Sequence, residues 1–240
     1  MKKSLTVFSA LLMLTSVGAA LPAVQLGTTP TAQAASLNAA KLANGKYSVK
    51  YAITKSGTTT PSEAARYLTG KAAVTVKNKK ATVTLTVTKA GNPFIQAMTL
   101  NGQKATVTKK ASGNTYTFSN VNLKASHTLG FSLAVPMNGK TVTMNEAATL
   151  KFKTSTLVAT TKVKLSTKGV KAKAKKVVGT TTKGAKVTVK HGTTTLGKTT
   201  AKKTAYTVKL KKAVKKSWKL KVTATKAGYK TVTKTITVAK

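Results

Sequence analysis

Few side chains in this sequence could do acid–base, nucleophilic or metal chemistry. There are two carboxylates, Glu63 and Glu146, two histidines, His127 and His191, and no cysteine. Hydrolysis by paired carboxylates would need the two Glu residues within about 10 Å of each other. We expect the histidines to be strand or surface residues, so a serine nucleophile has no triad to activate it. Without cysteine, thiolate metal sites, iron–sulfur clusters and disulfides are excluded, and we predict that the protein is not an enzyme.

One stretch does carry a pattern suited to binding, Ser62 to Tyr67, with the sequence SEAARY. Ser62 follows Pro61, where a side-chain hydroxyl can cap a single helical turn. Arg66 places a cation next to the aromatic ring of Tyr67. Taken alone, the stretch predicts only a helix cap followed by an aromatic residue at the edge of a core. A binding role depends on the elements around it.

Those elements are predicted to be strands. Apolar and polar residues alternate over 47–53, 74–76, 83–87, 94–100, 105–109, 116–123 and 129–135, and a last strand ends at Phe152. The turn signals between them are Asn78-Lys79-Lys80, Asn101-Gly102 and Asn138-Gly139. Short strands with a turn every 8 to 12 residues or so indicate an all-β sandwich.

The composition shifts from Thr161 onward, where the last 80 residues contain 24 lysines and no acidic residue. Val187 with Val189, and Leu220 with Val222, keep the alternation of strands. The simple sequence of 171–176 leaves a disordered basic tail as an alternative. With its glycine spacing, this part resembles small bacterial immunoglobulin-like modules. The fold class is therefore all-β, with two immunoglobulin-like β-sandwich domains.

The predicted boundaries place a signal peptide at 1–34, a linker at 35–41 and the first sandwich at 42–155. A linker at 156–160 and the basic domain at 161–240 follow. Lys2 and Lys3 precede the apolar run 5–14, and Ala32-Gln33-Ala34 is a small-x-small cleavage pattern. The apolar run is shorter than the roughly 20 residues that span a bilayer, so we predict export and no transmembrane segment in the mature protein.

The order of the first strands around SEAARY gives the chain a family resemblance. LANGKYSVKYAI, SEAARYL, the hairpin AAVTVKNKKATVTLTV, NTYTFSNVNL and HTLGFSLAVPM resemble a near-iron-transporter (NEAT) domain, the haem-handling sandwich of Gram-positive cell surfaces. The resemblance covers about half of the chain and implies haem as the cofactor. It implies that Ser62 hydrogen-bonds a haem propionate and that Tyr67 packs on the pocket rim. Arg66, or a neighbouring lysine, would add charge to the propionate contact.

The last strand departs from the family pattern. Haem-binding members carry YxxxY there, whose first tyrosine binds ferric iron, but this sequence is KTVTMNEAATLKF. Val142 and Glu146 fall near the two tyrosine positions, and neither is an ordinary haem ligand. Met144, whose thioether can bind iron, is the candidate metal ligand, with a Met that fills a β core as the alternative.

The net charge of +41 predicts a polyanionic partner. For an exported protein, that partner is expected to be an anionic cell-wall polymer such as teichoic acid. Nucleic acid would also bind by charge, but few aromatic residues are present to stack on bases, so we expect no specific nucleic-acid function.

Two functions follow. The first is a secreted, wall-associated protein that captures haem or a haem protein for iron acquisition and is held to the wall by its basic domain. The alternative is a wall adhesin or structural surface protein that keeps the NEAT fold without binding haem.

Overall fold

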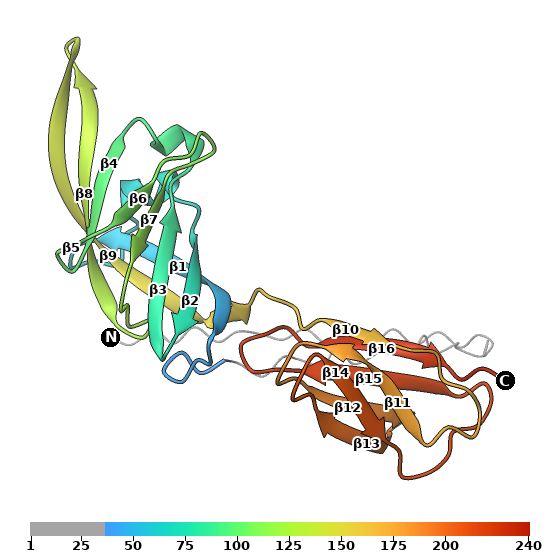
Figure 1. Ribbon diagram of the computed structural model, residues 1–240. Coiled ribbons are helices and arrows are strands. Elements are labelled where there is room, and N and C mark those ends of the chain that lie inside the picture. The colour runs from blue at the N-terminus through green and yellow to red at the C-terminus, as the bar shows by residue number, and fades with distance from the viewer. Residues whose placement is uncertain (1–36) are drawn as a thin grey trace, which may run out of the picture. The chain divides into compact units, whose positions relative to one another are not determined.

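The computed structural model describes residues 37–240, so the predicted signal peptide at 1–34 lies outside the described residues (Figure 1). Throughout 37–240 the regular structure is strand, apart from the two short 3-10 helices η1 (Glu63–Tyr67) and η2 (Lys89–Gly91). This confirms the predicted all-β fold. No helix in this part of the chain is long and apolar enough to cross a membrane.

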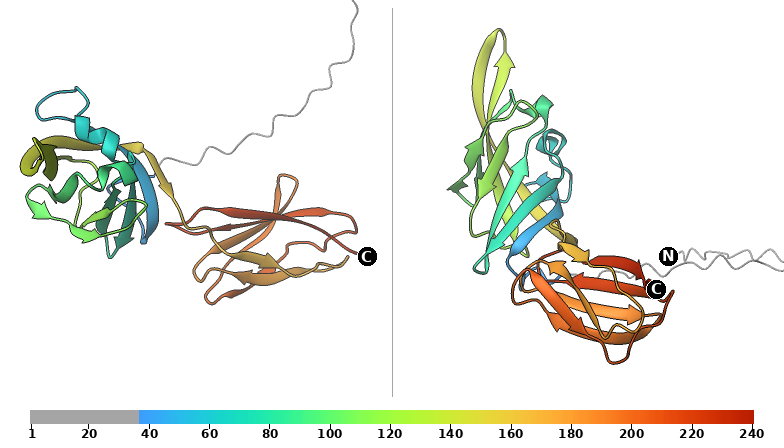
Figure 2. Two further views of the ribbon diagram at one scale, coloured as in Figure 1. Left: turned by 90° about the horizontal axis from the view of Figure 1, so that it is seen from above. Right: turned by 45° about the vertical axis from the view of Figure 1, so that its right-hand side comes forward.

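The first nine strands form one antiparallel sheet in the order β5-β4-β8-β9-β1-β2-β3-β7-β6. The strands are β1 (Gly45–Lys55), β2 (Lys71–Lys77), β3 (Lys80–Thr86), β4 (Ile95–Leu100), β5 (Gln103–Lys104), β6 (Thr106–Thr108), β7 (Thr115–Phe118), β8 (Ser126–Met137) and β9 (Lys140–Ala159). Figure 2 shows this sheet from two further directions.

The sheet folds over so that its two ends face each other across one hydrophobic core. The hydroxyl of Tyr116 on β7 donates a hydrogen bond to the carbonyl of Ile95 on β4, at 2.6 Å, although these strands lie far apart in the sheet order. Both residues are fully buried and belong to the same core cluster. The result is the predicted sandwich.

Two tight turns fix the register of the long hairpins. Asn78 and Lys79 join β2 to β3 with φ angles of 50° and 64°, and Asn138 and Gly139 join β8 to β9 with 50° and 75°. Two-residue turns with both φ angles positive match the twist of paired strands, and Asn and Gly are the residues that enter this region most readily.

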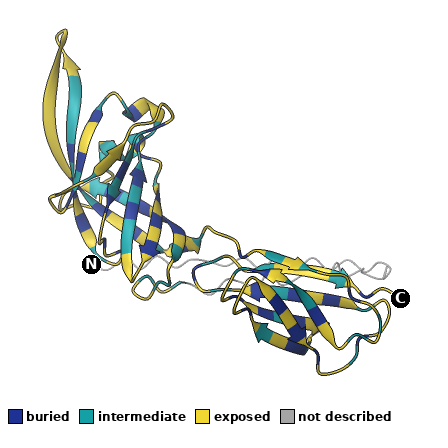
Figure 3. Cartoon of the chain, viewed as in Figure 1, coloured by how far each residue is buried: buried dark blue, intermediate teal, exposed yellow. Residues whose placement is uncertain are grey.

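The β8–β9 hairpin continues beyond the core. Buried residues end at Phe131 on β8 and resume at Ala148 on β9, and the residues between these two points are exposed or half-buried. The hairpin tip is accordingly coloured as exposed in Figure 3. β4 pairs with β8 as far as Leu133, and β1 pairs with β9 as far as Ala148. Beyond these points the hairpin forms a wall with no further strand of the sheet paired to it.

Both predicted linkers are at least partly ordered. Leu37 and Ala39 pack against the first core. Residues 156–159 are the end of β9, where Val158 pairs with Ser48 and Ala159 pairs with Tyr47 on β1. The segment that remains between the two sets of strands is 160–164, which is as long as the predicted linker but begins four residues later.

Residues from Val163 onward build a second core cluster between two sheets, β10-β11-β14 and β13-β12-β15-β16. The strands are β10 (Leu165–Thr167), β11 (Lys176–Thr181), β12 (Lys186–His191), β13 (Thr194–Thr200), β14 (Ala205–Lys209), β15 (Lys219–Thr225) and β16 (Val232–Thr237). The basic region is thus ordered β structure, and the disordered-tail alternative is wrong. Its assignment as an immunoglobulin-like domain stays a prediction.

Candidate functional site

The turn that contains SEAARY is the 3-10 helix η1, as predicted. Ser62 is its N-cap: the backbone N–H of Ala64 donates to the Ser62 hydroxyl oxygen at 3.3 Å. The N–H of Ser62 donates to the carbonyl of Ile53 at 3.0 Å, which ties the start of the turn to β1. Because the hydroxyl oxygen accepts from the backbone, its own hydrogen stays available to donate to a ligand.

Tyr67 closes the turn with its ring half-buried against the ring of Phe94, at 5.5 Å between centroids. The guanidinium carbon of Arg66 lies 5.0 Å from the centre of the Tyr67 ring. A Cβ at Gly91 would come within 2.9 Å of the Tyr67 Cβ and 2.6 Å of a Val87 methyl group. Glycine is therefore required at position 91 for Tyr67 of η1 to pack this closely against the 87–91 segment.

A cavity of about 600 Å³ lies between η1 and the overhanging β8–β9 hairpin. Its volume lies within the usual range for small-molecule sites, about 300 to 1,000 Å³. The walls combine an apolar surface with a few charged and hydroxyl groups. The lining residues are Lys55, Ser62, Glu63, Ala64, Arg66, Tyr67, Phe94, Ile95, Phe131, Leu133, Val135, Glu146 and Ala147.

The predicted residues Ser62, Arg66 and Tyr67 all line this cavity, whereas Val142 and Met144 do not. The register of the hairpin places these two on the cavity side, because Val142 pairs with Val135 and Met144 with Leu133. Directly paired residues point to the same face of an antiparallel sheet. The side chains of Val142 and Met144 are 42% and 40% exposed, so they lie toward the tip, beyond the enclosed part of the cavity.

Met144 therefore does not fill a β core, which was the alternative to its role as an iron ligand. Glu146 pairs with Phe131 and lines the cavity itself. Its carboxylate is the oxygen donor that the last strand presents to this space.

The charged groups at the cavity carry both signs. The Arg66 guanidinium and the Glu63 carboxylate form an ion pair at 3.3 Å, with side chains 65% and 77% exposed. Glu63 and Glu146, the two carboxylates of this chain, both line the same cavity. Lys55 adds an ammonium group at the end of β1.

The alternation of Phe131, Leu133 and Val135 predicts a core strand, but the structure places all three on the cavity wall. Phe131 is buried, whereas Leu133 and Val135 are half-buried. Nothing in the local pattern distinguishes a wall from a core, because both need the same period of two. The signal that could have separated a wall from a core is length, because β8 and β9 are longer than the other strands of the sheet, which could cover them only in part.

The histidines take structural positions, as expected. His127 is buried on β8, where Asn101 Nδ2 lies 2.9 Å from its Nδ1 and the Asn122 carbonyl lies 2.8 Å from its Nε2. Both ring nitrogens are therefore used within the protein. His191 stacks on Trp218, with ring centroids 4.0 Å apart.

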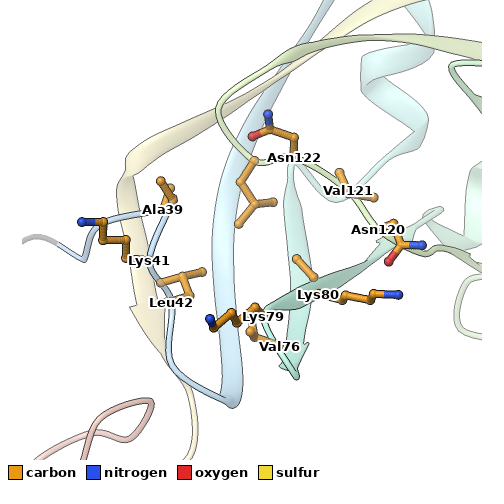
Figure 4. A pocket seen from close by; sticks show the side chains of 12 residues that line it. Ala39, Lys41, Leu42, Val76, Lys79, Lys80, Asn120, Val121 and Asn122 are labelled. Carbon is orange, nitrogen blue, oxygen red and sulfur yellow. The ribbon is translucent and has the colours of Figure 1, made fainter.

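A second cavity, of about 820 Å³, lies among the 39–42 segment, the β2–β3 turn and the 120–123 loop (Figure 4). Its charged groups are Lys41, Lys79 and Lys80, and its floor includes Val76 and Leu42. Its lining adds the amides of Asn120 and Asn122 but has no carboxylate, hydroxyl or aromatic side chain, so it offers an anion only lysine charges and amide hydrogen bonds. The smaller cavity beside η1 is the better candidate, because a hydroxyl, both charge signs and aromatic walls converge there.

Residues 40–154 match the model of the NEAT family, the Iron Transport-associated domain. Among solved structures, similarity is found to the NEAT5 domain of IsdX2, a B. anthracis hemophore in complex with heme, with 19% identity and a TM-score of 0.40; the match covers 46% of this chain and 97% of that one. A mutant of that domain in complex with heme is 20% identical, with 47% and 97% covered and a TM-score of 0.40.

The BSP domain of a biofilm associated protein is 18% identical, with 67% of this chain and 27% of that one covered and a TM-score of 0.29. The search of curated proteins found no match. The family match includes η1, the cavity and β9 as far as residue 154. The part of the chain that builds the cavity therefore lies within the residues that match the NEAT family model.

Proposed function

We propose that this protein captures haem, either free or from a haem protein, in the cavity between η1 and the β8–β9 hairpin. The observation that carries the proposal is that a cavity of ligand size lies at the Ser62–Tyr67 turn within the residues matched to an iron transport-associated family. An exported haem-capture protein would serve iron acquisition.

The residues at the cavity fit haem. A porphyrin needs apolar walls for its faces, and Phe94, Phe131 and Leu133 supply them. Its two propionates need donors and cations at the mouth, and Ser62, Arg66 and Lys55 supply these. When bound, haem supplies the iron chemistry, and the chain supplies the slot, the propionate contacts and an axial donor from β9.

Arg66 is able to change partner. Its ion pair with Glu63 is exposed on both sides, and exposed pairs contribute only about 0 to 1 kcal/mol. A propionate that approaches Arg66 together with the Ser62 hydroxyl offers a charge-assisted contact of greater strength, about 1.5 to 3 kcal/mol. The existing pair therefore orients the guanidinium at little cost to ligand binding.

Two side chains on β9 compete for the role of axial ligand. Met144, the candidate from the sequence, lies on the cavity face but toward the tip, and its thioether suits ferrous iron. Glu146 lines the cavity and offers an anionic oxygen, which suits ferric iron. The oxidation state that binds more tightly would separate the two.

The basic strands from β10 onward are proposed to retain the protein at the cell wall by charge. The 24 lysines of the last 80 residues face no carboxylate in that segment. An anionic wall polymer such as teichoic acid would neutralise them. Retention on isolated walls should then fall steeply with added salt, since exposed charges are screened within about 8 Å at physiological ionic strength.

One observation favours the alternative function, an adhesin or structural wall protein that keeps this fold without haem. Strand β9 carries no tyrosine, histidine or cysteine along its 20 residues. The experiment that decides is haem addition to the purified protein, followed by desalting and an absorption spectrum. A retained Soret band supports haem capture. If no band is retained with either ferric or ferrous haem, the function that remains is that of an adhesin or structural wall protein.

A further inference from the structure

The outward face of the β13-β12-β15-β16 sheet consists of lysine and threonine alone. The strand register places on this face five lysines and eight threonines: Thr195, Lys198 and Thr200 from β13, Lys186, Thr188 and Lys190 from β12, Lys219, Lys221, Thr223 and Thr225 from β15, and Thr233, Thr235 and Thr237 from β16. We call this set the Lys/Thr face.

Burial and one hydrogen bond support this assignment. The alternate residues, such as Val187, Leu220 and Val222, are fully buried in the second core, so their neighbours must point outward. The hydroxyls of Thr223 and Thr233 lie 3.0 Å apart, which shows that paired residues of β15 and β16 share the outer face.

The charges on this face repel one another. Lys190 of β12 lies directly opposite Lys221 of β15, and Lys219 is two residues from Lys221 on the same strand. Like charges directly across a sheet are destabilising. No carboxylate follows Glu146 in the sequence, so this segment supplies no counter-charge of its own. An external anion would relieve the repulsion.

The other sheet of the same core differs. Its outward positions on β11 and β14 hold the paired lysines Lys176 and Lys209 and two threonines, but also the apolar Val178 and Ala205, which interrupt the face. The concentration of lysine and hydroxyl groups on the four-stranded sheet is therefore a property of that face, beyond the general excess of lysine in the sequence.

The face is also free of aromatic side chains. Trp218 and His191 stack on each other, and the Lys212 ammonium lies 5.4 Å from the Trp218 ring centre. His191 pairs with Leu220, a buried residue, and so has the inward orientation. Nucleic-acid surfaces for single strands usually offer aromatic rings on which bases stack. This face offers none.

We propose that the Lys/Thr face binds a phosphodiester polymer whose repeating unit is a polyol. The lysine ammonium groups would contact the phosphates, and the threonine hydroxyls would exchange hydrogen bonds with the hydroxyl groups between them. The proposal rests on the retention function proposed above and assigns it to one surface. It favours a polyol phosphate over a nucleic acid because hydroxyls replace aromatic rings.

The test uses the full chain and lipid-free poly(glycerol phosphate), with single-stranded DNA of equal phosphate concentration as the competing probe. The variant is Lys190→Gln with Lys221→Gln. The control is Lys176→Gln with Lys209→Gln, which removes the same charge from a directly opposed lysine pair on the other sheet. Both changes relieve a repulsion, so neither should lower the melting temperature.

We expect the Lys190/Lys221 variant to bind poly(glycerol phosphate) about tenfold more weakly at physiological salt. The slope of log affinity against log salt should fall by about 1.5, since each lost phosphate contact removes about 0.7 to 0.9. The control pair should lose less than about twofold. Tighter binding of DNA than of poly(glycerol phosphate) by the unchanged protein would overturn the choice of ligand.

Equal losses in the two variants would overturn the Lys/Thr face while leaving retention by overall charge in place. If the unchanged protein fails to bind the polymer at all, the retention proposal fails together with the face. The failures of the two proposals are thus distinguishable.

Discussion

At the residue scale, Ser62 has two roles that substitutions can separate. It caps η1 through an accepted hydrogen bond, and its hydroxyl hydrogen remains for a ligand. Ser62→Ala should weaken haem binding roughly ten- to a hundredfold, because a hydrogen bond to a charged group contributes about 1.5 to 3 kcal/mol. Ser62→Asp keeps the cap acceptor but repels a propionate, so it should lose haem and keep the fold. Ser62→Thr should keep both, as measured by haem titration and thermal unfolding.

The axial ligand is a second question at this scale. Met144→Leu conserves volume, so it should cost little stability, and Glu146→Gln removes the negative charge while it keeps the shape of the side chain. If Met144 is the ligand, only the first change should alter the haem spectrum; if Glu146 is the ligand, only the second should. Val142→Tyr should strengthen ferric haem binding, because Val142 lies on the cavity side of β9. No gain would argue against the proposed position of haem along the hairpin.

The buried hydroxyl of Tyr51 should make the stability of the folded protein depend on pH. Burial raises the pKa of this hydroxyl to about 12, against a smaller lowering by the nearby Gly70 backbone and Thr69 side chain. Within residues 37–240, neither neighbour meets the distance and angle of a full hydrogen bond to this buried hydroxyl, so it is left unsatisfied. Unfolded tyrosine loses its proton near 10. Below that pH the contribution of Tyr51 is fully present, and between about 10 and 12 the unfolded state binds fewer protons, so stability falls as pH rises.

At pH 8 the Tyr51→Phe variant should be as stable as the parent or up to about 1 kcal/mol more stable, because an unsatisfied hydroxyl is removed. It should also lose less stability between pH 8 and 11.5, which urea unfolding at the two values would measure. A variant that is clearly less stable at pH 8 would show that the hydroxyl has a partner.

At the element scale, the sequence predicted the strands far better than the cavity. Alternation and the Asn78 and Asn138 turns specified the hairpins, because a period of two and a tight turn are local properties. The cavity depends on how far β8 and β9 project past the core, and this is set by packing between strands that are distant in sequence. The same limit explains the linker predicted at 156–160, since Val158 pairs with Ser48 more than 100 residues away.

The overhang of β8–β9 can be removed without entering the core. Replacing residues 135–142 with Asn-Gly would join Ala134 to Thr143, which already pair, through a two-residue turn. Stability should change by less than about 1 kcal/mol, because the fully buried residues of the hairpin end at Phe131 and Ala148. Haem retention should fall, because the change removes Val135 from the cavity lining together with Val142 on the same face of the hairpin. Undiminished retention would place the ligand elsewhere.

At the scale of the whole molecule, the charge distribution connects stability to the proposed partner. A net charge of +41 works against a compact state through self-repulsion, and Lys50 illustrates this locally because it pairs with Lys71 on one side and Lys153 on the other. Surface ion pairs cannot offset the repulsion, since the one salt bridge found within residues 37–240 is Arg66 with Glu63.

The melting temperature should consequently rise with sodium chloride from about 10 mM to 500 mM, because the screening length falls from about 30 Å to less than 8 Å. A polyanion should achieve the same increase at far lower ionic strength, because it binds the folded lysine arrays. Differential scanning fluorimetry at matched ionic strength, with and without poly(glycerol phosphate), measures both effects. A melting temperature that is indifferent to salt would mean that the lysines are too far apart, or too well hydrated, for repulsion to limit the fold. The charge repulsion would then have no measurable link to stability, whereas a gain from polymer binding would remain, because a ligand of the folded state stabilises it in any case.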